Sequence, residues 1–135
     1  MALMTWSTKF SVGVRTMDDQ HTVLFDTLND LHNAMMKGDG QKQTGPLLRS
    51  LIKYTHDHFS AEEAMMEAAH YPELSAHRAK HRDLTRQVEQ YVARYERGEV
   101  TLNIHLLNFL RDWLTNHIQG ADHQYGPWLN SHGVK

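Results

Sequence analysis

Apolar residues recur at every third or fourth position along four stretches of the chain, and glycine and proline fall mainly between these stretches. This spacing matches the 3.6-residue turn of an α-helix and gives each helix one apolar face. We expect helices over residues 18–37, 43–69, 72–97 and 101–119. Each helix has to bury its apolar face against the others, and short connections place consecutive helices antiparallel. The sequence therefore predicts an all-α fold, an antiparallel up-down-up-down four-helix bundle.

The helical pattern extends over most of the 135 residues, a length that suits a single domain over residues 1–135. About 17 residues at the start lack the pattern and are expected to form an irregular N-terminal arm, with Trp6 and Phe10 as candidate anchors. The tail, YGPWLNSHGVK, is expected to add a short cap.

Composition excludes several classes of protein. The chain has no cysteine, so disulfides and thiolate metal sites are excluded. A net charge of −2 gives no support for a nucleic-acid or anionic-membrane partner. The N-terminus lacks the pattern of a signal peptide, and no apolar run approaches the ~18 residues of a membrane span. We expect a cytoplasmic protein that neither binds nucleic acid nor inserts into a membrane.

The chain contains 11 histidines, and some of them stand where the helical pattern calls for leucine. Glu62 lies four residues after one of them and shares its helix face. The remaining histidines lie off the apolar faces, in turns, in the tail or too far along a helix axis. The histidines on the apolar faces are His21, His58, His77, His81 and His117.

These five histidines and Glu62 are also expected at one depth. In the predicted topology the first and third helices begin where the second and fourth end, and all six residues lie near those ends. A single pair such as His77 and His81 would ordinarily be a solvated pair on a helix surface. Six converging polar side chains are costly to bury without a partner, whereas imidazole and carboxylate are metal ligands. The sequence therefore predicts a metal centre.

A second carboxylate does not follow from α-helical spacing alone. Asp122 follows His117 by five residues, and an ideal α-helix would turn it off the face of His117. Gly120 offers a break that would redirect it. His123 remains an alternative to Asp122, and Glu63 an alternative to Glu62, although Glu63 lies off the face that carries His58.

The number of ligands indicates the kind of centre. Five imidazoles and two carboxylates are too many for one tetrahedral zinc ion and suit two bridged transition-metal ions. The rival architecture, a ferritin-like carboxylate bundle, needs an ExxH motif on each of two helices. This chain has one ExxH, Glu67 to His70, at a helix end.

Four motifs resemble those of single-domain bacterial hemerythrins: DDQH at 18–21, HFSAEE at 58–63, HRAKH at 77–81 and DWLTNHIQGAD at 112–122. The resemblance covers nearly the whole chain and implies a non-haem di-iron centre, with two Fe ions joined by an oxo or hydroxo bridge. It implies that His77, His81 and His117 hold one iron, and that His21 and His58 hold the other. Glu62 and Asp122 would bridge the two irons, which favours Asp122 over His123.

The resemblance further implies reversible O2 binding, for oxygen storage, delivery or transport, without catalytic turnover. O2 would bind at the open position of the second iron, and an O2-consuming protein is a candidate partner. The alternatives are a di-iron enzyme that reduces peroxide or nitric oxide, an iron store and an O2 sensor. Leu24, Phe59, Trp113 and Leu114 lie beside the proposed ligands in sequence or one helical turn away. We expect them to form an apolar wall around O2, although ordinary core packing would explain them equally well.

Overall fold

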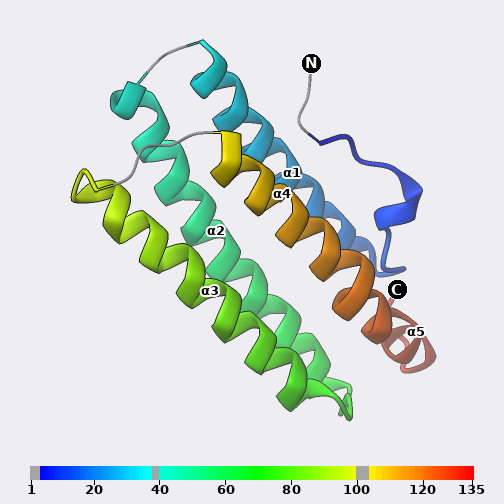
Figure 1. Cartoon of the computed structure of the whole chain (residues 1–135). Coiled ribbons are helices and arrows are strands. Elements are labelled where there is room, and N and C mark those ends of the chain that lie inside the picture. The colour runs from blue at the N-terminus through cyan, green and yellow to red at the C-terminus, as the bar shows by residue number, and fades with distance from the viewer. Residues whose placement is uncertain (1–3, 38–39, 100–103) are drawn as a thin grey trace.

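The computed structural model describes residues 4–37, 40–99 and 104–135, apart from the side chains of residues 40–44 and 105. Four long helices lie side by side, and the described residues contain no strand (Figure 1). The helices are α1 (Arg15–Met36), α2 (Gly40–Ala68), α3 (Leu74–Glu96) and α4 (Ile104–His117). A π-helical segment, η2 (Ile118–Asp122), joins α4 to a further helix, α5 (His123–Ser131). The predicted all-α, up-down-up-down bundle is confirmed.

The helices begin at somewhat different residues from those expected. Helix α1 already begins at Arg15, because the N–H of Asp18 donates to the carbonyl of Val14 at 2.9 Å. Helix α3 begins at Leu74, so Pro72 precedes the helix and does not lie in its first turn. Residues 101–103 of the expected fourth helix lie outside the described residues.

The C-terminal part differs most from the expectation. The chain does not break at Gly120 but passes through η2 into the nine-residue helix α5. Tyr125 and Leu129 of α5 are buried, and the indole N–H of Trp128 donates to the carbonyl of Ala69 at 2.9 Å. The tail is thus an element of the core that closes one end of the bundle.

The N-terminal arm contains one 3₁₀ turn, η1 (Thr8–Phe10), and packs on α1. The rings of Trp6 and Phe10 lie 5.4 and 4.9 Å from the ring of Phe25, so both expected anchors contact the core. Farther along the arm, the carboxylate of Asp18 accepts hydrogen bonds from the hydroxyl of Ser11 at 2.6 Å and from the N–H of Val12 at 2.8 Å.

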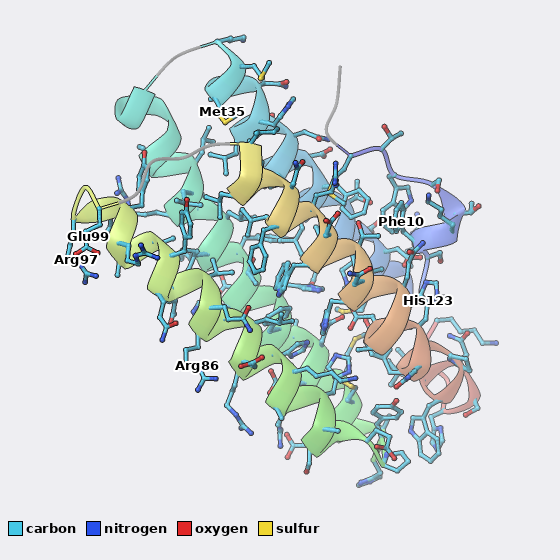
Figure 2. All side chains as sticks on the ribbon, viewed as in Figure 1. Phe10, Met35, Arg86, Arg97, Glu99 and His123 are labelled. Atoms are coloured by element: carbon cyan, nitrogen blue, oxygen red, sulfur yellow. The ribbon has the colours of Figure 1, made fainter. Side chains whose placement is uncertain are left out.

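The antiparallel arrangement brings the start of α1, the end of α2, the start of α3 and the end of α4 to one end of the bundle (Figure 1). Met35 and Arg97 lie toward the opposite end from His123 (Figure 2). The buried charged and imidazole side chains lie within a few turns of the first end, whereas the described buried side chains toward the opposite end are mainly aliphatic and aromatic. None of the described helices combines the length and apolar character needed to cross a bilayer.

Candidate metal centre

All seven residues expected as ligands are buried together at the end of the bundle that α5 closes. Each has a relative exposure of 7% or less. They come from every long helix and from η2: His21 from α1, His58 and Glu62 from α2, His77 and His81 from α3, His117 from α4 and Asp122 from η2.

The ligand atoms form two overlapping groups. Within each group the ligand atoms all lie within 4.8 Å of one another. We call them the three-histidine group and the two-histidine group, and both contain Glu62 and Asp122. The three-histidine group adds His77, His81 and His117, and the two-histidine group adds His21 and His58.

Glu62 turns one oxygen toward each group. Its Oε1 lies 3.2 Å from Nε2 of His81, in the three-histidine group. Its Oε2 lies 3.4 Å from Nε2 of His21 and 3.5 Å from Nε2 of His58, in the two-histidine group. A carboxylate that divides its oxygens in this way is placed to bridge two cations.

Asp122 divides its oxygens in the same sense. Its Oδ1 lies 3.0 Å from Nε2 of His77 and 3.1 Å from Nε2 of His117. Its Oδ2 lies 3.1 Å from Nε2 of His21. The two carboxylates therefore connect the same two groups of imidazoles from different sides.

The π-helical turn explains how Asp122 reaches this position. The N–H of His123 donates to the carbonyl of Ile118, five residues earlier, which is the hydrogen bond of a π-helix. The wider turn brings residues five apart over one another, so Asp122 lies above His117. The backbone does this without a break at Gly120. His123, the alternative ligand, is in neither group.

At two of the histidines, a hydrogen bond at Nδ1 shows which nitrogen of the imidazole ring carries the proton. Nδ1 of His58 lies 2.6 Å from the amide oxygen of Gln20, and Nδ1 of His81 lies 3.1 Å from Oε2 of Glu63. Because both partners are acceptors, each Nδ1 carries the proton and each Nε2 faces the carboxylates with its lone pair. Glu63 thus lies on the outer side of His81 and is not an alternative to Glu62 in these groups.

Tyr125 also belongs to this site, and sequence reasoning placed it in the tail. It is fully buried on α5, its hydroxyl donates to Oε2 of Glu62, and its ring lies 5.6 Å from that of His77. No local pattern distinguishes this tyrosine in the sequence. Its position follows from the π-helical turn and from the docking of α5.

The charges of the buried groups depend on one another. Burial alone would lower the pKa of His21, but the carboxylates of Asp122 and Glu62 outweigh it and raise this pKa to about 9. Burial and Glu62 act to raise the pKa of Asp122, yet the imidazoles of His117 and His21 hold it below its usual value. Burial also acts to raise the pKa of Glu62, but the imidazoles, above all His58, hold it well below its usual range.

The site has the unmet bonding capacity that a metal centre would satisfy. The Nε2 atoms of His81 and His117 face each other at 3.1 Å, where two lone pairs repel unless a proton or a cation lies between them. Buried polar atoms without a partner are rare in folded proteins. Those on the seven expected ligands are both ring nitrogens of His21, Nε2 of His58 and His77, Oε1 of Glu62, and both carboxylate oxygens of Asp122. This donor set of imidazole and carboxylate fits two intermediate transition-metal ions.

The four residues expected to form an apolar wall have different surroundings. Leu24 and Leu114 are buried in the core. The ring of Phe59 stacks on that of His81 with centroids 3.7 Å apart. The ring of Trp113 lies nearly parallel to that of His117, with centroids 6.3 Å apart, and lines a groove of about 580 Å³ between α3 and α4. The two aromatic residues thus cover the three-histidine group.

Comparisons with known proteins agree with this site. Residues 12–129 match the family described as the hemerythrin HHE cation binding domain. The chain is 38% identical to a bacteriohemerythrin of Methylococcus capsulatus (strain Bath), over 97% of this chain and 100% of that protein. It is 30% identical to myohemerythrin-1 of Phascolopsis gouldii, over 80% of this chain and 88% of that protein. A crystal structure of wild-type hemerythrin, 38% identical, superposes with a TM-score of 0.90 over 95% of this chain and 98% of that chain.

Proposed function

Because the chain belongs to the hemerythrin family, we propose that it binds O2 reversibly at a non-haem di-iron centre. The observation that carries the proposal is the pair of buried groups that share Glu62 and Asp122. Each of these carboxylates presents one oxygen to each group, as bridging ligands of two iron ions would.

The two positions would differ in the number of protein ligands. His77, His81 and His117 would hold one iron together with the two carboxylates, which makes five ligand residues. His21 and His58 would hold the other with the same carboxylates, which makes four. With one further bridging oxygen, the first iron would have six ligands and the second five, which would leave one position for O2.

When bound, the two irons would supply the electron pair that O2 takes up reversibly. The protein holds the ligands in place and limits the access of water. Nε2 of each histidine faces the carboxylates, and the buried ring of Phe59 stacks on His81. Leu24 and Leu114, also buried, would add apolar atoms around the centre. Low access of water slows protonation and the irreversible oxidation that follows it.

Reversible binding without turnover suits storage, delivery or transport of O2. An O2-consuming protein is the partner that delivery or transport would require. Only two of the seven proposed ligands are carboxylates, and the other five are imidazoles, which would bind the metal in their neutral form. Fewer anionic ligands stabilise high-valent iron less, which favours a carrier over an oxidising enzyme.

The test is a spectroscopic cycle on iron-loaded protein. The chain is reduced without oxygen, exposed to air and returned to vacuum, while visible absorption is followed and iron is counted. We expect two irons per chain and an absorption change that reverses over repeated cycles. Irreversible oxidation in the first cycle would contradict the proposal. Steady turnover of peroxide or nitric oxide with a reductant would favour an enzyme, and iron well above two per chain would favour a store.

A further inference from the structure

Residues outside the ligand set make the two metal positions chemically unequal. We propose that Glu63, acting through His81, makes iron at the three-histidine position the easier of the two to oxidise, while Gln20 leaves the other position without this effect. The inference rests on the proposed di-iron centre. Glu63 is a positioning residue here, because it contacts a ligand and not the metal.

A chain of hydrogen bonds runs from the surface to His81. The Nδ1–H of His81 donates to Oε2 of Glu63 at 3.1 Å, and the Nε–H of Arg78 donates to Oε1 of the same carboxylate at 3.1 Å. Arg78 also donates to Glu67 at 3.3 Å. The side chain of Glu63 is 25% exposed and that of His81 is 2% exposed, so the carboxylate lies where the buried centre meets solvent. Arg78 orients one oxygen and leaves the other for His81.

The corresponding hydrogen bond in the two-histidine group has a neutral acceptor. The Nδ1–H of His58 donates to the amide oxygen of Gln20 at 2.6 Å. Nδ1 of His21 is buried and has no hydrogen-bond partner in the described part of the chain. His81, in the three-histidine group, thus has a charged outer acceptor, and His58, in the two-histidine group, has a neutral one.

This difference has a direct electronic consequence. A carboxylate that accepts the Nδ1 proton makes the imidazole more basic, and a neutral amide does so less. A more basic imidazole donates more electron density through Nε2 and stabilises Fe³⁺ relative to Fe²⁺. The first electron removed from a diferrous centre would therefore come from the three-histidine position. In the proposed centre that position would have no free coordination site, so one iron would give the first electron and the other would bind O2.

We expect that Glu63 can be replaced without unfolding the chain. Exposed ion pairs contribute little to stability, and both partners of Arg78 are at least partly exposed. Glu89 provides a matched control, because it pairs with His56 at 2.7 Å across the same two helices and both side chains are about half exposed. Glu89→Gln removes the same charge as Glu63→Gln without touching a ligand.

The first experiment measures midpoint potentials of the iron-loaded protein at an electrode with mediator dyes. Glu63→Gln keeps an acceptor for His81 but removes the charge, so we expect one of the two one-electron potentials to rise. Gln20→Glu adds a charge beside His58, so we expect the other potential to fall. Glu89→Gln should leave both unchanged. Two bound irons with unchanged potentials in Glu63→Gln, or a shift equal to that of Glu89→Gln, would overturn the inference.

The second experiment assigns the affected position by titrating metal-free protein with Co²⁺ and following visible absorption. Glu63→Ala should weaken one of the two Co²⁺ sites about 10- to 100-fold, and Glu63→Gln should restore most of this affinity. The weakened site should be the one that His77→Ala abolishes. Weakening of the other site would overturn this inference but leave the proposed function standing. If the unmodified chain fails to hold two irons, both the proposed function and this inference fall.

Discussion

At the scale of single residues, each histidine of the centre presents one nitrogen, Nε2, to the carboxylates. Their Nε2 atoms lie between 3.0 and 3.5 Å from a carboxylate oxygen. At this spacing a neighbouring side chain would have to move to replace a missing imidazole. Removal of one histidine should therefore lower metal binding chiefly at the position that this histidine faces.

We expect His77→Ala to lower the iron content below two per chain, because it removes one of three imidazoles from the three-histidine group. The visible absorption change on exposure to air should be lost with it. His56→Ala is the control, since His56 is exposed and pairs with Glu89. Two irons and an unaltered spectrum in His77→Ala would show that His77 is not a ligand.

The pKa of His21 predicts how the metal-free protein responds to pH. This pKa is raised from 6.5 to about 9, so the protonated imidazole stabilises the fold fully below pH 6.5. That contribution is lost as pH rises through about 9, and it amounts to roughly 3 kcal/mol. Urea unfolding in the presence of a chelator should show a falling free energy of unfolding between pH 6.5 and 9. The fall should be smaller in His21→Gln, and a free energy that rises over this range would contradict the assignment.

Sequence spacing predicted the residues that share a helix face, but not their partners on other helices. Glu62 and the five histidines follow from the 3–4 spacing and from their common depth. Asp122 required the family resemblance, because five residues do not fit an α-helical face. The hydrogen bonds of Gln20, Glu63 and Tyr125 depend on how neighbouring helices are placed along each other, which a single sequence does not state.

At the scale of elements, η2 is the part of the fold that the sequence least predicted. A continuous α-helix rotates about 100° per residue, so five residues would leave Asp122 about 140° away from the face of His117. The π-helical turn removes this rotation. π-helical turns of this kind inside α-helices occur often at functional sites.

Gly120→Ala tests whether the π-helical turn η2 positions Asp122 by itself or requires the glycine. Gly120 is exposed, and a Cβ there would meet no atom within 4 Å. Its backbone lies in a helical segment, so alanine should stabilise the fold by about 0.5–1 kcal/mol. We expect two metal ions to be retained and the melting temperature to rise slightly. Loss of a metal would mean that the glycine itself is required.

Gly126→Ala in α5 should have the opposite effect. A Cβ at Gly126 would lie 2.0 Å from the carbonyl oxygen of Val12, so the N-terminal arm would have to move. We expect the free energy of unfolding to fall by about 1–3 kcal/mol. Urea unfolding of this variant and of Gly120→Ala under the same conditions would measure it. Equal stability of the two variants would contradict this packing of the arm on α5.

The same contact explains why the sequence did not predict α5. The tail was expected to form only a short cap, and a glycine followed by a proline, as at 126 and 127, is ordinarily a turn signal. In the structure Pro127 lies inside α5, and Gly126 admits the backbone of the arm. Tertiary packing therefore overrides the local preference. The four longer helices were predictable because their apolar faces repeat over many turns.

At the scale of the whole molecule, the centre joins all four helices of the bundle. Its proposed ligands come from α1, α2, α3, α4 and η2. Metal binding to the folded chain alone stabilises that state in proportion to its affinity. The bundle should therefore be more stable, and more rigid at one end, when the metal is bound.

We expect removal of the metal by a chelator to lower the melting temperature and to speed amide exchange around His21, His58 and His117. Exchange in the half of the bundle near Met35 should change less, because the seven proposed ligands lie toward the other end. Hydrogen exchange followed by mass spectrometry would measure both halves in one sample. A uniform increase along all helices would show that the bundle responds as one unit.

The position of the centre at one end also has an evolutionary consequence. The seven proposed ligands all lie near one end of the bundle, whereas the described buried side chains toward the other end are mainly aliphatic and aromatic. Purifying selection should therefore act unevenly along each helix, with substitutions accumulating toward Met35 and Arg97. The less constrained half is where a lineage could acquire inserted segments or an attached module while the inherited chemistry stays intact.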